Sequence, residues 1–134
     1  IKKLIKVSKK FPKLVLNGFT EIKNKKQYFS RNIPKVVFSK NNELLYMSRS
    51  PIPGNKKDKF TKAWRQVCGY IIPKKKLIKF YSFNKKSDLE NLEDIEILRF
   101  IEMGEKVKMI KLSSSSLAID TPQDLALAKK KLSK

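Results

Sequence analysis

Asp120 is the side chain with the clearest chemical context in this sequence. It lies in the segment "LAIDTPQDL", at the carboxyl end of a predicted strand and directly before a predicted helix. Ligands of open α/β sheets bind beyond that end of the strands. A carboxylate there can hold a divalent cation that neutralises a polyphosphate. The alternative is that Asp120 only caps the helix that follows.

Arg49 raises a second chemical possibility, in the segment "ELLYMSRSPIPGNK" that covers residues 43–56. It follows an apolar run and precedes a turn with two prolines, so we expect it at the end of a strand. Its planar guanidinium matches a carboxylate or a phosphate with two parallel hydrogen bonds. Arg49 is therefore a candidate anion clamp, and the alternative is an ordinary surface arginine.

Acidic residues gather in one stretch of an otherwise basic chain. Seven of the twelve acids fall between positions 88 and 105. Glu93 and Glu96 are three residues apart and share a face if the stretch is helical, with Arg99 within ion-pair reach of Glu96. One hypothesis is that one or more of the carboxylates of Glu90, Glu93, Asp94 and Glu96 accept hydrogen bonds from a hydroxylated ligand. The other is a solvated acidic face that favours the helix dipole.

The remaining candidates lie in one apolar segment, "QVCGYII". Tyr70 could offer its phenol to a ligand, or it could simply fill the core. Cys68 has no histidine base anywhere in the chain, which argues against a catalytic thiol and against a structural zinc site. A single cysteine excludes an internal disulfide and fits a reducing cytoplasm, where we expect the protein to be.

The net charge is +20 over 134 residues, and all but four of the 32 basic residues are lysine. Lysines contact phosphates, so a small basic nucleic-acid-binding protein is an alternative function. Base reading, however, relies on arginine and on aromatic stripes. A solvated lysine surface therefore explains the charge without a nucleic-acid partner. No apolar run is long enough to span a membrane, and we expect no signal peptide.

The pattern of apolar residues predicts a single α/β domain in which strands alternate with helices towards the C-terminal end. We expect strands 34–38 and 44–48 to form a hairpin. Helix 89–103 carries an apolar stripe of Leu92, Ile95, Leu98 and Ile101, with Gly104 at its C-terminal cap. The other predicted strands are 13–17 (ended by Gly18), 66–72, 106–112 and 116–119, and the other helices are 73–82 and 122–134.

Four segments, taken in order, resemble the 3-deoxy-manno-octulosonate cytidylyltransferases (CMP-Kdo synthetases), and specifically the C-terminal half of such a protein. They are "IPKVVFSKNNELLYMSRSPIP", "WRQVCGYIIPKKKLIKF", "LENLEDIEILRFIEMGEKVKMI" and "AIDTPQDL". The resemblance implies a Rossmann-like nucleotidyltransferase fold of three layers around a mixed sheet. It also implies an enzyme that couples CTP to a 2-keto-3-deoxy sugar acid, releases pyrophosphate and forms a CMP-sugar for cell-surface polysaccharide (lipopolysaccharide) synthesis.

The same resemblance assigns roles to individual residues. Asp120 is expected to ligate the catalytic Mg²⁺, and Arg49 to bind the sugar acid. Gln66 stands where many of these enzymes carry histidine, which leaves room for a related acid such as an amino-Kdo or a nonulosonic acid. The further residues expected to line the sugar-acid pocket are Gln66, Tyr70, Glu93 and Glu96.

The resemblance also sets expectations for the whole chain. Residues 1–134 are expected to form the C-terminal part of one cytidylyltransferase domain. The family's arginine-containing phosphate loop and second metal-binding aspartate are not present in the sequence. The chain alone is therefore expected to be inactive. The family implies a homodimer without specific nucleic-acid binding or membrane insertion.

Overall fold

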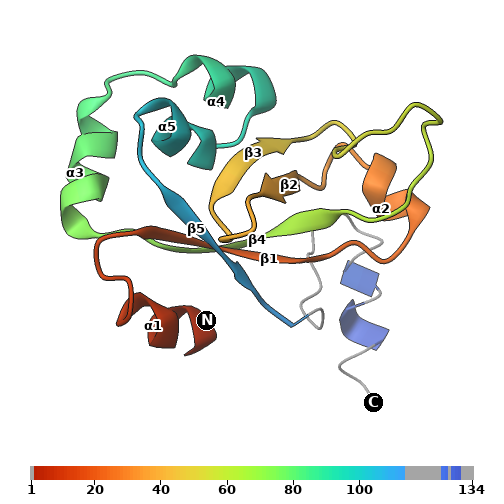
Figure 1. Cartoon of the computed structure of the whole chain (residues 1–134), viewed down its shortest axis with the longest axis horizontal. Coiled ribbons are helices and arrows are strands. Elements are labelled where there is room, and N and C mark those ends of the chain that lie inside the picture. Colours follow the sequence, from red (N-terminus) through yellow and green to blue (C-terminus); the bar gives the residue numbers. More distant parts are fainter. Residues whose placement is uncertain (1, 114–124, 127, 131–134) are drawn as a thin grey trace.

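The computed structural model describes residues 2–113, 125–126 and 128–130. Five strands and five helices are defined within them, and the α/β prediction is confirmed. Figure 1 shows their arrangement. In chain order the elements are α1 (Lys2–Ser8), β1 (Val15–Glu21), α2 (Lys25–Phe29), β2 (Lys35–Phe38), β3 (Leu44–Ser48), β4 (Trp64–Ile71), α3 (Lys74–Ser82), α4 (Asp88–Glu93), α5 (Ile97–Glu102) and β5 (Val107–Lys111).

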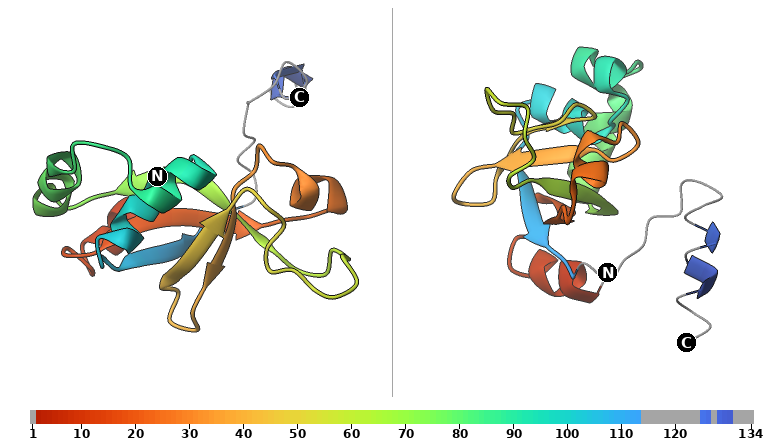
Figure 2. Two further views of the ribbon diagram at one scale, coloured as in Figure 1. Left: turned by 90° about the horizontal axis from the view of Figure 1, so that it is seen from above. Right: turned by 90° about the vertical axis from the view of Figure 1, so that its right-hand side faces the viewer.

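The strands form one mixed sheet in the order β3-β2-β4-β1-β5. Only β1 and β5 pair in parallel, and the other neighbours are antiparallel. The predicted hairpin of β2 and β3 is confirmed. Figure 2 shows α2 and α3 at opposite ends of the sheet. The loop after α2 therefore lies far from α3.

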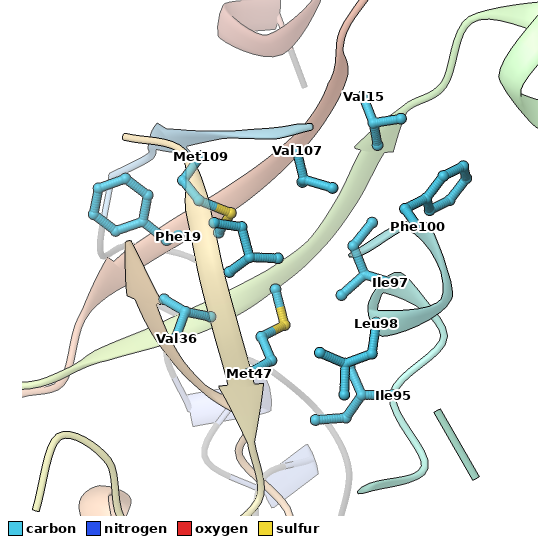
Figure 3. Close-up of a cluster of buried hydrophobic side chains, with 11 residues drawn as sticks. Val15, Phe19, Val36, Met47, Ile95, Ile97, Leu98, Phe100, Val107 and Met109 are labelled. Atoms are coloured by element: carbon cyan, nitrogen blue, oxygen red, sulfur yellow. The ribbon is translucent and has the colours of Figure 1, made fainter. Parts of the chain in front are cut away.

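Alternating side chains bury the two faces of the sheet against different helices. Val15 and Met109 point to the face covered by α5, whereas Leu16 and Ile110 point to the face covered by α1. Figure 3 shows the larger cluster, in which side chains from the sheet meet those of the α4–α5 region. Its buried members are Val15, Phe19, Val36, Leu44, Met47, Ile95, Ile97, Leu98, Phe100, Val107 and Met109.

The first strand does not end at Gly18, as predicted, but continues through it to Glu21. A Cβ at position 18 would lie 2.5 Å from the Leu112 side chain and 3.3 Å from that of Val67. Glycine is needed here because neighbouring side chains approach the backbone closely, and not because the strand stops. The register also shifts between Asn17 and Gly18.

The predicted helix over 89–103 is wrong in its continuity. The structure has two short helices separated at Asp94, which adopts a left-handed conformation with φ +53°. The break turns α5 relative to α4, so Leu92 is 80% exposed instead of lying on a buried stripe. Ile95 and Leu98 are buried as predicted, and Gly104 follows α5 with a positive φ.

Arg99 does not pair with Glu96. Its guanidinium makes two hydrogen bonds with Glu90, at 2.5 Å from Nε and 2.7 Å from Nη2. It also stacks on the Phe80 ring, with its central carbon 3.9 Å from the ring centroid. Both charged groups are almost fully buried. Arg99 therefore ties α4 to α5 and α3 instead of forming part of a ligand face.

Several other predictions concern the ends of the chain and its connecting segments. The segment before β2 contains a short helix, α2, capped by the Asn24 side chain, for which no helix was predicted. The predicted strand 116–119 lies outside the described residues. Of the predicted helix 122–134, residues 125–126 and 128–130 are described and are helical. Within the described chain, no helix combines the length and the apolarity needed to cross a lipid bilayer.

Candidate functional site

A pocket of about 500 Å³ opens between the loop after α2, the end of β3, β4 and the α4–α5 link. It brings together four of the five residues predicted to bind substrate, which come from distant parts of the sequence. Those four are Arg49, Gln66, Tyr70 and Glu96. The other lining residues are Asn32, Ile33, Pro34, Arg65, Cys68, Asp94 and Ile95.

The Arg49 guanidinium is held in place by three backbone carbonyls. Nε donates to the carbonyl of Glu93 at 2.8 Å, Nη2 to that of Asp94 at 3.0 Å, and Nη1 to that of Arg31 at 3.1 Å. Arginine has five N–H groups, so each terminal nitrogen keeps one that no carbonyl accepts, and Nη2 also lies 3.6 Å from the Asp94 carboxylate. Arg49 also lies on the pocket wall. Its geometry suits a carboxylate that approaches the two terminal nitrogens end-on.

Glu93 lies behind the pocket and is not part of its lining. Its carboxylate accepts hydrogen bonds from the Ser48 hydroxyl at 2.6 Å, the Arg49 backbone N–H at 2.8 Å and the Tyr46 hydroxyl at 3.3 Å. Burial raises the pKa of the Glu93 carboxyl, but these hydrogen bonds outweigh burial and hold the pKa below its usual value. Glu93 therefore remains ionised and holds the C-terminal end of β3, directly before Arg49, in place.

Tyr70 presents a protonated hydroxyl to the pocket. Its oxygen lies 2.7 Å from the Gln66 side-chain nitrogen. Burial raises the pKa of Tyr70 to about 12, and the nearby Cys68 and Glu96 add to this, while the hydrogen bond from Gln66 acts in the opposite direction. The phenol is therefore neutral at physiological pH and keeps its hydrogen.

The lining carries charge of both signs. Arg49 and Arg65 supply cationic side chains, and Glu96 supplies a carboxylate acceptor. The Asp94 carboxylate also lines the pocket but already pairs with Lys86 at 3.0 Å and with Arg49 at 3.6 Å. Hydroxyl groups donate readily to carboxylates, whereas anionic groups pair with guanidinium. A small polar ligand with an acidic group and several hydroxyls matches this combination.

Sequence reasoning missed two polar lining residues, Asn32 and Arg65, and counted a third, Asp94, only among the carboxylates of the acidic stretch. Asn32 lies in a segment without a periodic pattern, where nothing in the local sequence marks it, whereas Asp94 was placed inside the predicted helix 89–103. Arg65 lies one residue before the predicted strand 66–72, and side chains that are neighbours in a strand point to opposite faces, so nothing indicated that it would line the same pocket as Gln66. The proximity of Arg65 to Gln66 in the sequence was the one available signal.

Cys68 is exposed and lines the same pocket. It lies between Gln66 and Tyr70 on β4, at the two-residue spacing that puts alternate side chains on one face. Histidine is absent from the sequence, so no imidazole can activate the thiol. Cys68 thus contributes a small wall position to the pocket.

The predicted metal ligand, Asp120, lies outside the described residues. In the part of the chain that the structure covers, no group of three or more histidine, cysteine, aspartate or glutamate side chains could hold a metal ion. The Mg²⁺ site therefore stays a prediction that depends on Asp120.

Comparisons with known proteins reproduce the resemblance found in the motifs. The 3-deoxy-manno-octulosonate cytidylyltransferase of Thermodesulfovibrio yellowstonii is 37% identical over 118 residues, which cover 81% of this chain and 45% of that protein. The enzyme of the same name from Christiangramia forsetii is 36% identical over 115 residues, covering 85% of this chain and 46% of that protein. This chain is a relative of the 3-deoxy-manno-octulosonate cytidylyltransferases.

The similarity extends to the fold. A solved structure of CMP:2-keto-3-deoxy-manno-octonic acid synthetase complexed with CTP matches 98% of this chain and 54% of its own, with a TM-score of 0.83 and 23% identity. The chain spans about half the length of the curated cytidylyltransferases it matches. No family model matches the sequence. The nucleic-acid-binding alternative has no support among these relatives.

Proposed function

We propose that this chain is the C-terminal, sugar-acid-binding part of a single cytidylyltransferase domain. The complete enzyme would couple CTP to a 2-keto-3-deoxy sugar acid of the Kdo type and release pyrophosphate, in the cytoplasm. The resulting CMP-sugar would supply cell-surface polysaccharide synthesis, including lipopolysaccharide. The observation that carries the proposal is the pocket that gathers Arg49, Gln66, Tyr70 and Glu96.

The chemistry of a sugar acid agrees with the two kinds of wall. Its carboxylate would pair with the N–H groups of Arg49 that the backbone leaves available. Its hydroxyls would donate to Glu96 and Asp94 on the wall formed by the α4–α5 link. Such paired contacts orient the acid, so that its anomeric hydroxyl faces the nucleotide. Positioning of this kind is a major source of rate in a two-substrate reaction.

The reaction itself is attack of the anomeric hydroxyl on the α-phosphorus of CTP, with the bond to pyrophosphate breaking. Mg²⁺ held by Asp120 would neutralise the phosphates. The nucleotide would be bound by the N-terminal half of the complete enzyme, and the present chain would supply the binding site for the acid. By the same resemblance we propose a homodimer.

A binding experiment on the 134-residue chain tests the acid site directly. Titration with 3-deoxy-manno-octulosonate, followed by ¹H–¹⁵N spectra, is expected to shift the signals of Arg49, Gln66 and Tyr70. A neutral sugar of similar size serves as the ligand control, because it lacks the carboxylate. Shifts confined to other surfaces, or equal shifts with the neutral sugar, would remove the sugar-acid assignment.

A second experiment tests the reaction in a complete enzyme that carries this segment. Pyrophosphate release from CTP is measured with a panel of keto-sugar acids, for the wild type and for Asp120→Asn. Loss of most turnover with an unchanged melting temperature is expected. Turnover close to that of the wild type would end the metal-ligand role of Asp120.

A further inference from the structure

A β-bulge next to the pocket leaves part of β4 without a strand partner. Gly18 pairs with Val67, whereas the preceding residue of β1, Asn17, pairs with Tyr70. Two residues of β4, Cys68 and Gly69, therefore stand between consecutive pairs. The Asn17 side chain fills the gap, because Nδ2 donates to the carbonyls of Val67 at 3.2 Å and Gly69 at 3.0 Å.

These contacts fix which way the Asn17 amide faces. Backbone carbonyls only accept hydrogen bonds, so the NH₂ group must point to them and Oδ1 must point away. Asn17 is fully buried, which makes the reversed orientation costly since it would leave donors and acceptors unpaired. Oδ1 consequently lies 3.4 Å from the side-chain nitrogen of Gln66.

The orientation of the Asn17 amide also determines the orientation of the Gln66 side-chain amide. Gln66 is only 7% exposed, and an oxygen facing Asn17 Oδ1 would place two acceptors against each other. Its Nε2 therefore faces Asn17, and the same nitrogen donates to the Tyr70 hydroxyl at 2.7 Å. Each of the two N–H groups on Nε2 thus has its own acceptor.

The hydrogen-bond chain from Asn17 through Gln66 to Tyr70, called the relay below, ends at the pocket. The Tyr70 oxygen accepts from Gln66, so its own hydrogen is free to be donated to another atom. Tyr70 is 40% exposed and lines the pocket. We propose that Asn17 is a positioning residue which, through Gln66, makes Tyr70 a hydrogen-bond donor to the bound acid. The Tyr70 hydroxyl would then select a ligand that presents a hydrogen-bond-accepting oxygen to it.

This proposal rests on the proposed function and specifies which kind of ligand atom the pocket accepts beside Tyr70. The oxygen at Tyr70 would belong to the acid's carboxylate or to its ring, both of which can accept. A ligand that presents an ammonium group there would meet a donor and would be rejected. Arg49 and Arg65 line the same pocket, and they also favour an electron-rich atom.

A spectroscopic measurement tests the relay without any ligand. In ¹H–¹⁵N spectra of the 134-residue chain, the Gln66 side-chain NH₂ signals are expected to move when Tyr70 is changed to phenylalanine and again when Asn17 is changed to serine. The Tyr46→Phe variant is the matched control, because Tyr46 bonds Glu93 and not Gln66. Gln66 signals at the positions of a solvated amide, unmoved by Tyr70→Phe, would overturn the relay.

A double-mutant cycle tests the consequence for binding, with 3-deoxy-manno-octulosonate as the probe. Tyr70→Phe is expected to weaken binding roughly tenfold, as loss of one hydrogen bond does. Gln66→Glu places an acceptor beside Tyr70 and draws its hydrogen away from the ligand, so a similar loss is expected. In the Tyr70→Phe background, Gln66→Glu should then cost little more.

The outcomes separate the possible failures. Additive losses would show that Gln66 contacts the acid itself, which overturns the relay to the ligand. Unchanged binding in Gln66→Glu would also overturn it. A wild-type chain that binds none of the acid while its Gln66 amide responds as expected would contradict the proposed function and leave the Asn17–Gln66–Tyr70 hydrogen bonds established.

Discussion

Arg49 serves two purposes at once, since its guanidinium caps a helix and faces the pocket. The left-handed turn at Asp94 ends α4 and frees the last carbonyls of that helix. Arg49 donates to two of them, those of Glu93 and Asp94. The residue that we propose to bind the acid is therefore oriented by a helix end from the other side of the pocket.

The first prediction concerns the planar fork of Arg49. Arg49→Lys keeps the charge but cannot reach three carbonyls and a ligand together. We expect sugar-acid affinity to fall about tenfold or more, because bidentate pairing is lost. Isothermal titration of the acid measures this. Arg31→Lys is the control, since the Arg31 side chain bonds the Ser50 hydroxyl and is not part of the lining. Equal losses in both variants would contradict the assignment.

Glu93 gives a prediction about acid stability. The folded-state pKa of its carboxyl lies below the usual value, so Glu93 stabilises the fold above the unfolded pKa. That stabilisation is lost as pH falls from the usual glutamate range through the lowered pKa. Glu93→Gln should remove this part of the pH dependence. It should also lower stability by about 1–3 kcal/mol at neutral pH, because an amide donor then faces other donors.

Urea unfolding at a series of pH values measures both effects. Glu21→Gln is a suitable control, because among the described residues the Glu21 carboxylate makes just a long ion pair with Lys23, at 4.0 Å. A Glu93→Gln variant whose acid limb matches that of the wild type would refute the argument.

At the scale of elements, the buried pair of Arg99 and Glu90 joins three helices. Removing one partner leaves the other charge buried and unpaired. Arg99→Met is therefore expected to destabilise the chain by about 3–5 kcal/mol in urea unfolding. The exposed pair of Lys106 and Glu43 offers the contrast, since Lys106→Met should cost no more than about 1 kcal/mol. A small loss of stability in Arg99→Met would contradict this prediction. It would mean that apolar packing on Phe80 at this position holds the helices together without the ion pair.

Local sequence predicts most of the elements, because their signals are local. The β2–β3 hairpin follows from two apolar runs around a polar turn, and α3 follows from a helical run behind Pro73. The break at Asp94 has no such signal: aspartate is neither glycine nor proline, and the group that caps the freed carbonyls is Arg49, about 45 residues earlier. Tertiary contacts decided this element.

Some residues of the candidate site could likewise be predicted from the sequence, and others could not. Arg49, Gln66, Tyr70 and Glu96 could be named because the motifs resemble a known family, and the pocket gathers them. Asn17 could not be named, because its role depends on a β-bulge that pairing across strands creates. An asparagine at the end of the predicted apolar strand 13–17 was the one hint, and by itself it does not indicate a bulge.

The whole molecule is strongly basic, and this gives the last prediction. With a net charge of +20, the chain should bind DNA of arbitrary sequence at low ionic strength. The binding should disappear near 0.15 M salt, because exposed charges are screened beyond about 8 Å. Fluorescence anisotropy with single- and double-stranded oligonucleotides across a salt series measures it. Submicromolar affinity that persists at physiological salt would favour the nucleic-acid-binding alternative.

Cys68 makes this site unusually easy to observe. The chain has one cysteine, and that cysteine is exposed on the pocket wall between Gln66 and Tyr70. A thiol-reactive dye or spin label would therefore attach at a single position, next to the proposed acid site, without any engineered residue. The rate of alkylation by a small maleimide should fall as the pocket fills. The protein thus carries its own reporter of occupancy, one that would allow candidate acids to be ranked from the unmodified sequence.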